Sequence, residues 1–240
     1  MDISVIVPAF DEASRISSAL ERINTYFSNS FKTYEIIVVD DGSTDDTRAI
    51  VENLAESIGS LRLIHNSPPN VGKGHAIKQG ILSSSGDLVL VSDADLSTPL
   101  SEIEKLMPFI QRGCDIAIGS RKLSSSDIQV RQPWYREGMG KIFNVIVRLL
   151  LIRSIADTQC GFKLFKGEIA RKLFMISRIT GFSFDVEILF LAERKGYTIE
   201  EVPVRWFHAP DSKVRLLRDP FFMLIDLIKI RLFWLLNRYH

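Results

Sequence analysis

The first 120 residues alternate short apolar runs with amphipathic helical patterns, and this alternation constrains the fold more than any other feature. The apolar runs are rich in Val, Ile and Leu, as strands buried on both faces of a parallel sheet must be. Strand, helix and strand in succession imply a parallel sheet with right-handed crossovers. The sequence therefore predicts an α/β fold, with strands over Ile3–Val7, Glu35–Val39, Leu61–His65, Asp87–Ser92 and Asp115–Gly119.

The helices are placed by residue spacing and by capping residues. One helix face is formed by Ile16, Leu20, Ile23 and Phe27. Ser43–Asp46 supplies the side-chain oxygens typical of a helix N-terminus. In the second half we predict helices over Ile142–Ile155, Phe184–Glu193 and Pro220–Tyr239. Val202–Val204 predicts a short or edge strand, because Pro203 lacks a ladder donor.

Charge divides the chain into an acidic half and a basic half. Residues 1–120 carry 9 Lys and Arg against 17 Asp and Glu, whereas residues 121–240 carry 21 against 12. The acidic half suits a metal ion, and the basic half suits a phosphate-bearing partner or an anionic membrane. No basic run with interleaved aromatic residues occurs, so we expect no nucleic-acid partner. The two cysteines exclude a disulfide scaffold and a four-cysteine zinc site.

Carboxylates gather where three predicted strands end, at Pro8–Glu12, Asp40–Ser43 and Asp93–Asp95. Open α/β sheets bind ligands at the carboxyl ends of their strands. Carboxylates so gathered repel each other unless a cation or donor groups offset them. Helix capping alone can explain the second cluster. In the third, Asp93 and Asp95 alternate in an extended segment, which favours a hard divalent cation, Mg²⁺ or Mn²⁺, shared with phosphate oxygens.

The segments VIVPAFDE, VVDDGSTD and SDADLSTP resemble the family-2 glycosyltransferases of the GT-A fold. In that family a DxD-type motif holds the metal that bridges a nucleotide-sugar diphosphate. Further segments are similar to its polyprenyl-phosphate branch, and most of all to the dolichyl-phosphate β-glucosyltransferases: Gly119–Arg121, Asp157–Phe165, Phe184–Leu189, Glu201–Trp206 and Ser212–Lys213. The resemblance extends from residue 3 to about residue 235 and implies a GT-A domain over 1–215.

The resemblance implies a role for each residue that matches the family. The uracil and ribose would be held by Pro8, Phe10, Glu12, Val39 and Asp41. Asp93 and Asp95 would hold the diphosphate and the metal, with Ser97 as a further metal ligand where mannosyl relatives carry Gln. Arg121 and Arg136 would hold the acceptor phosphate, and Lys213 would close over the phosphates. Residues 1–120 would then form the nucleotide-sugar and metal half, and residues 121–215 the acceptor half.

The expected reaction is inverting transfer of glucose from UDP-glucose to a polyprenyl phosphate, such as dolichyl or undecaprenyl phosphate. A lipid monophosphate is already largely ionised near neutral pH and needs no base. We therefore interpret Asp157 and Glu187 as structural, or as orienting a phosphate-binding Arg. The same chemistry with GDP-mannose or another UDP-sugar stays open, as does a non-catalytic nucleotide-sugar-binding module at a membrane.

Two apolar helical patterns interspersed with basic residues, Ile142–Ile155 and the C-terminal segment 216–240, are typical of helices in the lipid headgroup region. Packing on the core or in an oligomer interface is an equal alternative for either one. No apolar stretch is long enough to span a bilayer, and we expect a protein peripheral to the cytoplasmic face of a membrane. Asn70–Gly74 lacks the spacing of a Walker loop and is either a tight turn or a ribose or phosphate contact.

Overall fold

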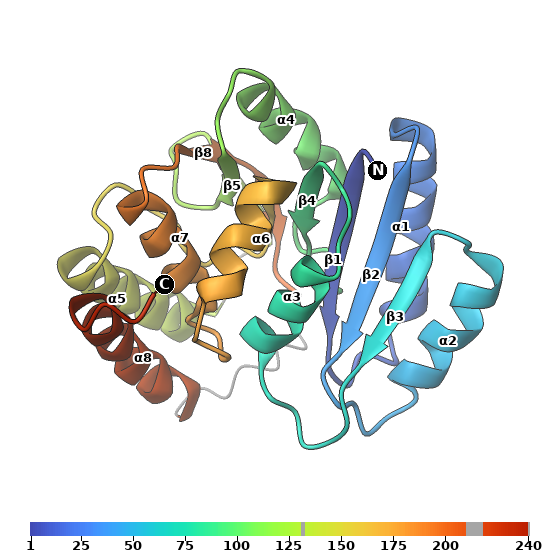
Figure 1. Cartoon of the computed structure of the whole chain (residues 1–240), viewed down its shortest axis with the longest axis horizontal. Helices are drawn as coiled ribbons and strands as arrows, with labels where there is room; N and C mark the ends of the chain where they lie inside the picture. Colours follow the sequence, from blue (N-terminus) through green and yellow to red (C-terminus); the bar gives the residue numbers. More distant parts are fainter. Residues whose placement is uncertain (131–132, 210–217, 240) are drawn as a thin grey trace.

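A computed structural model describes residues 1–130, 133–209 and 218–239 (Figure 1). Its strands are β1 (Ile3–Ala9), β2 (Tyr34–Asp40), β3 (Leu61–His65), β4 (Leu88–Val91), β5 (Ile116–Ser120), β6 (Asp127–Val130), β7 (Lys163–Lys166), β8 (Ile199–Pro203) and β9 (Arg205–Phe207). Its α-helices are α1 (Ile16–Ser30), α2 (Thr47–Ser57), α3 (Lys73–Leu82), α4 (Ile103–Gln111), α5 (Trp134–Leu150), α6 (Gly167–Ile176), α7 (Phe184–Arg194) and α8 (Arg218–Leu235).

Seven strands form the central sheet in the order β3-β2-β1-β4-β7-β5-β8, and β6 pairs with β9 in a second small sheet. The pairs β1–β2, β1–β4, β2–β3 and β5–β8 are parallel, whereas β7 runs antiparallel between β4 and β5. The predicted mostly parallel sheet flanked by helices is confirmed. Because β1, β2 and β4 are parallel neighbours, their carboxyl ends lie at one edge of the sheet.

Two layers of helices cover the sheet. On one face, the core contains side chains from α1, α2 and α4, including the predicted stripe of Ile16, Leu20, Ile23 and Phe27. On the other face, α3, α5, α6, α7 and α8 contribute to a second core cluster. The strands between these layers are almost entirely buried, as their Val-rich and Ile-rich sequences require.

The second half of the chain differs from the expectation in several elements. Helix α5 begins at Trp134, directly after Pro133, and ends at Leu150. Its first two turns contain Gly138 and Gly140, so the apolar pattern that predicted the helix becomes visible only later. Strands β6, β7 and β9 were not predicted, because three or four residues are too few to show an alternation of period two. Strand β8 lies at the sheet edge and ends at Pro203, in agreement with the short or edge strand predicted around this residue.

One face of helix α8 packs into the core. Met223, Leu227 and Ile230 are buried in the same cluster as α5 and α7, and Figure 1 shows α5 and α8 side by side. The hydroxyl of Tyr239, just beyond α8, donates a hydrogen bond of 2.7 Å to the buried Glu187. Among the described residues, no helix combines the length and the apolar character needed to cross a bilayer.

Candidate active site

The predicted nucleotide-binding residues lie in the last residues of β1 and β2 or just beyond them, at the carboxyl edge of the sheet. Pro8 and Phe10 are partly exposed there, as a surface that contacts a base requires. Glu12 is paired with Arg15 through both of its carboxylate oxygens. Val39 is fully buried in the core, so its side chain offers no surface to a ligand.

Asp41 is held by the loop that leads into α3. Its Oδ2 accepts a hydrogen bond of 2.6 Å from the backbone N–H of Gly72, and its Oδ1 accepts bonds from Val71 N–H and from the Asn66 amide. These donors are neutral, so the carboxylate stays oriented while its charge is not paired with a cation by these contacts. The side chain is buried and fixed beside the strand end, where the resemblance implies a ribose.

Asp93 and Asp95 follow β4 in a tight loop. Oδ1 of Asp95 accepts a hydrogen bond of 2.9 Å from the backbone N–H of Ser97. Leu96 adopts a φ of 47°, in the left-handed region that costs a branched residue about 1 kcal/mol or more. Such a conformation persists only where its surroundings impose it. Here the N–H of Phe207 bonds the carbonyl of Ser97 and fixes the loop against β9.

A small cavity of about 20 Å³ lies between this loop and residues from distant parts of the chain. It is lined by Ser92, Asp93, Asp95, Leu96, Ser97, Thr98, Gly161, Phe162 and Trp206. That volume suffices for roughly one water-sized group. The loop that carries Asp93 and Asp95 (the acidic loop), the residues just before β7 and strand β9 therefore meet at the edge of the sheet.

The residues around Asp93 and Asp95 fit a divalent cation. A Cβ atom on Gly161 would lie 2.1 Å from Oδ2 of Asp93, so only glycine leaves room for this carboxylate. Oδ1 of Asp93 is buried, and the group in contact with it is the ammonium of Lys73. No group of three His, Cys, Asp or Glu side chains in the described part of the chain forms a metal site by itself. Mg²⁺ typically takes one or two protein carboxylates and completes its shell with water and substrate phosphate.

Lys73 is a site residue that the sequence analysis did not select. Its Nζ lies 2.6 Å from Oδ1 of Asp93, and the two groups form an ion pair. Behind it, Lys163 donates to Asp185 at 2.5 Å in a fully buried pair. Burial raises the pKa of Asp185, and the charges of Lys163 and Lys73 act against that rise. In the NVGKG segment, Asn70–Gly72 form a loop and Lys73 begins α3, so this segment carries a side chain into the site.

Arg121, the predicted acceptor-phosphate residue, is held by Asp157. Its Nε and Nη2 donate bonds of 2.7 and 2.8 Å to the two carboxylate oxygens, and its backbone N–H adds a third bond. Burial alone would raise the pKa of Asp157, but the charge of Arg121 outweighs burial and holds that pKa well below its usual value of 3.8. This geometry agrees with the interpretation of Asp157 as a residue that orients Arg121.

Trp206 connects the arginine to the acidic loop. The guanidinium carbon of Arg121 lies 5.5 Å from the centroid of the Trp206 ring, within the range of a cation–π contact. Trp206 also lines the cavity beside Asp93 and Asp95. The predicted acceptor residue and the predicted metal residues are thus joined through one aromatic side chain.

The other predicted residues lie apart from this cluster or outside the description. Arg136 is partly buried in the first turn of α5. Lys213 lies outside the described residues. Glu187 accepts hydrogen bonds from the backbone N–H groups of Arg178 and Ile179 as well as from Tyr239, and burial raises its pKa. Glu187 is a structural anchor for α8, in agreement with its interpretation as a structural residue.

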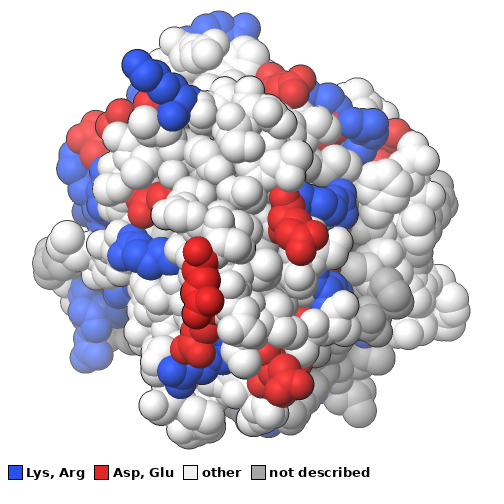
Figure 2. All heavy atoms as spheres, turned by 90° about the vertical axis from the view of Figure 1, so that its right-hand side faces the viewer, with Lys and Arg blue, Asp and Glu red and all other residues white. Residues whose placement is uncertain are grey.

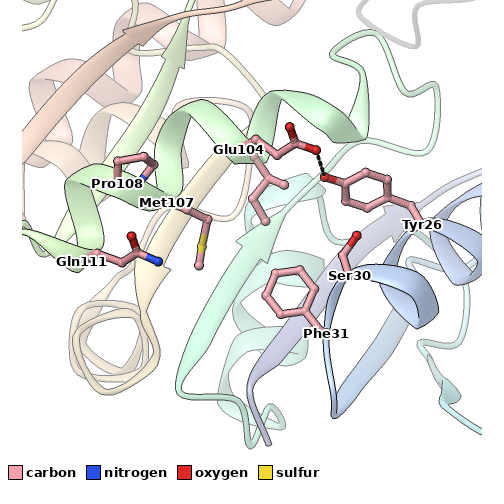
Figure 3. Close-up of a pocket in the computed structure, with 8 residues that line it drawn as sticks. Tyr26, Ser30, Phe31, Glu104, Met107, Pro108 and Gln111 are labelled. Carbon is pink, nitrogen blue, oxygen red and sulfur yellow. Dashed lines mark hydrogen bonds between the residues drawn. The ribbon is translucent and has the colours of Figure 1, made fainter.

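A larger cavity, of about 370 Å³, lies elsewhere, between α1 and α4 (Figure 3). Tyr26 donates a hydrogen bond of 3.0 Å to Glu104 at its rim, and burial together with Glu104 raises the pKa of Tyr26 to about 12. Its lining combines apolar side chains such as Phe31 and Met107 with few polar groups. Figure 2 shows acidic and basic side chains interspersed on another face, with no continuous basic surface there for a polyanion.

Comparison with known proteins places this geometry in a family. The family described as "Glycosyl transferase family 2" matches residues 4–174 of this chain. Dolichyl-phosphate beta-glucosyltransferase ALG5D of Trichomonas vaginalis is 36% identical over 248 residues, covering 98% of this chain and 74% of that protein. Dolichyl-phosphate beta-glucosyltransferase of Dictyostelium discoideum is 37% identical over 247 residues, covering 98% of this chain and 75% of that protein.

A solved structure shares the fold. Glucosyl-3-phosphoglycerate synthase from Mycobacterium tuberculosis, in complex with Mn²⁺, UDP-glucose and phosphoglyceric acid, superposes with a TM-score of 0.68 at 23% identity, covering 96% of this chain and 78% of that one. This likeness confirms the predicted GT-A fold. The chain belongs to glycosyl transferase family 2 and is a homologue of the dolichyl-phosphate β-glucosyltransferases.

Proposed function

We propose that this glycosyltransferase moves glucose from UDP-glucose to a polyprenyl phosphate, dolichyl phosphate in the first place, with inversion at the anomeric carbon. One observation carries the proposal. Arg121 stacks on Trp206, and Trp206 lines the same cavity as Asp93 and Asp95. A cation suited to an acceptor phosphate therefore lies next to carboxylates suited to a metal–diphosphate donor.

The donor assignment is supported by the relatives and by the strand-end residues. The related proteins are named for glucosyl transfer to dolichyl phosphate, and the structural neighbour binds UDP-glucose with Mn²⁺. In this chain Asp93 and Asp95 would hold the cation, with Ser97 near enough in sequence to contribute. A bound Mg²⁺ or Mn²⁺ would stabilise the negative charge that develops on the departing diphosphate.

The acceptor needs no general base from the protein. A phosphate monoester is largely a dianion near neutral pH, so its oxygen is already a nucleophile. Asp157 is engaged by Arg121, and Glu187 is engaged by backbone N–H groups and Tyr239. In one displacement the acceptor oxygen forms a bond to the anomeric carbon, the bond from that carbon to UDP breaks, and its electron pair leaves with UDP. Attack opposite the leaving group gives a β-linked product.

A membrane surface is the place where this reaction meets its lipid acceptor. Helices α5 and α8 pack together and expose large apolar side chains that the core does not cover: Trp134, Tyr135, Ile142, Val145, Leu149, Leu150, Phe221, Phe222, Ile228, Leu232 and Leu235. An apolar face of this size is typical of a protein or membrane contact. We propose that it lies in the headgroup region at the cytoplasmic face of a membrane.

The test is transfer of radiolabelled sugar to lipid. The full chain is incubated with Mn²⁺, with dolichyl or undecaprenyl phosphate in vesicles, and with labelled UDP-glucose, GDP-mannose or another UDP-sugar, and the organic phase is counted. We expect label from UDP-glucose alone. Label from GDP-mannose or another UDP-sugar instead would change the sugar assignment. Nucleotide binding without transfer from any donor would favour a non-catalytic binding module.

A further inference from the structure

Lys73 is brought to the acidic loop by two glycines that the packing requires. Gly72 has a φ of 130°, and a Cβ atom there would lie 2.5 Å from the carbonyl oxygen of Thr180. A Cβ atom on Gly74 would lie 2.6 Å from the Cβ of Phe184. The start of α3 therefore lies directly against the loop that leads into α7. This close approach places Lys73 between the acidic loop and the buried carboxylate of Asp185.

The charges around Lys73 do not balance at the acidic loop. Asp93 and Asp95 carry two negative charges, and of the described residues Lys73 is the cation in contact with Asp93. Lys163, the next cation inward, is engaged by Asp185 and by the carbonyl of Cys160. Lys73 therefore supplies one positive charge for the two carboxylates of Asp93 and Asp95, whereas Asp185 is already paired with Lys163. A divalent cation at Asp93 and Asp95 would lie close to the ammonium, and like charges repel.

Lys73 is partly exposed, whereas Lys163 is buried. The Lys73 side chain is 23% exposed, and its ammonium sits on a flexible four-carbon stem. Its contact with Asp93 is an ion pair with 2.6 Å between Nζ and Oδ1. The backbone N–H of Gly72, the residue before Lys73, donates a hydrogen bond to Asp41. Lys73 therefore lies at the edge of the sheet where the donor nucleotide is proposed to bind. A donor diphosphate would offer the ammonium several oxygens with full negative charge.

We propose that Lys73 is the internal counter-cation of Asp93: it pairs with that carboxylate before the donor binds, and exchanges it for the donor diphosphate when a divalent cation is bound. The inference rests on the proposed metal-dependent function. It makes a specific claim about order, because Lys73 weakens the binding of a metal alone and strengthens the binding of UDP when the metal is present.

The experiment measures Mn²⁺ binding to the full chain by the loss of the free-ion electron paramagnetic resonance signal. Lys73→Met and Lys73→Gln remove the charge, Lys73→Arg keeps it, and Lys172→Met on α6 is the matched control at an exposed lysine. Without nucleotide, both neutral variants should bind Mn²⁺ about tenfold more tightly than the wild-type chain. With saturating Mn²⁺, calorimetry should show that they bind UDP about tenfold more weakly, while Lys73→Arg and Lys172→Met stay close to wild type.

Each result decides one part of the proposal. Equal or weaker Mn²⁺ binding by either neutral variant that folds would overturn the counter-cation role and leave Lys73 as a static anchor. If neither neutral variant folds, Lys73 is a structural residue and the proposal is also overturned. If the wild-type chain binds no Mn²⁺ even with UDP, the metal dependence of the proposed function fails, and this inference fails with it.

Discussion

The donor side and the acceptor side of the site hold their carboxylates in opposite ways. On the donor side, Asp41 and Asp95 accept hydrogen bonds from backbone N–H groups, which fix them but bring no positive charge. On the acceptor side, Asp157 and Asp185 are paired with the cations Arg121 and Lys163. Asp41 and Asp95 thus keep their charge for a cation from outside, although Glu12 on the same side pairs with Arg15, and the acceptor carboxylates use theirs to position the protein's own cations. Lys73 combines the two arrangements, because it is a cation of the protein itself and is paired with the donor-side carboxylate of Asp93.

Removing a donor-side carboxylate should have the largest effect on the rate of transfer. Asp95→Ala is expected to lower transfer about a thousandfold, because the developing charge on UDP loses the cation that offsets it. The fold should survive, since the hydrogen bond of Asp95 is to Ser97 in its own loop. Labelled-lipid formation and thermal unfolding are measured together, with the exposed Asp46→Ala as a control. Wild-type transfer by a folded Asp95→Ala chain would refute the assignment.

Removing an acceptor-side carboxylate should cost stability instead. Asp157→Asn leaves Arg121 without its buried partner, and breaking such a pair costs about 3 kcal/mol. Because the pKa of Asp157 is lowered in the folded chain, its stabilisation is present above the usual value of 3.8 and is lost as pH falls through the folded value. The difference in free energy of unfolding between wild type and variant should therefore be constant above about pH 5 and shrink below it. A difference that grows in acid would contradict this.

Exchanging the acceptor cation tests whether the two sides act on different phosphates. Arg121→Lys keeps one positive charge but loses the planar fork that binds a carboxylate or phosphate through two bonds. We expect the KM for polyprenyl phosphate to rise about thirtyfold while the Kd for UDP is unchanged. Loss of UDP affinity with an unchanged acceptor KM would assign Arg121 to the donor diphosphate.

Changing the apolar surface should have the smallest effect. A double variant, Leu149→Gln with Leu235→Gln, lies on the exposed faces of α5 and α8 and should weaken co-sedimentation with anionic vesicles about tenfold. Transfer to a short, water-soluble acceptor should be unaffected. Met175→Gln, an exposed apolar residue on α6, is the matched control. Equal loss on both acceptors would show that this surface packs against protein and not against lipid.

The acidic edge of the site could be predicted from sequence, because each cluster directly follows a strand whose apolar pattern is clear. Asp93 and Asp95 needed only the position of β4 and the rule that parallel strands end at one edge. The resemblance added Arg121, whose contacts could not be derived locally. The burial of Val39 follows from its central strand, but which face of that strand meets a ligand depends on how α3 packs.

The rest of the site depends on contacts between distant segments. Lys73 lies 20 residues before Asp93, and Gly161 and Trp206 reach the same cavity from beyond β5. Strand β7, which brings Gly161 there, has four residues and no visible alternation. Helix α8 shows the same limit. Its apolar residues face both the core, as Leu227 does, and solvent, as Leu235 does, and sequence alone did not separate the two faces.

The antiparallel strand β7 has a consequence for the order of folding. Strands β1, β2 and β3 pair across separations of 31 and 25 residues, so this part of the sheet closes through comparatively local contacts, whereas β4 pairs with β1 across 85 residues. Strand β7 must then insert between β4 and β5, and its pairing with β4 joins residues about 75 positions apart. Loops of that length close slowly. The nucleotide edge should therefore acquire protection from hydrogen exchange before the cavity around Asp93 exists, and the catalytic centre is completed last.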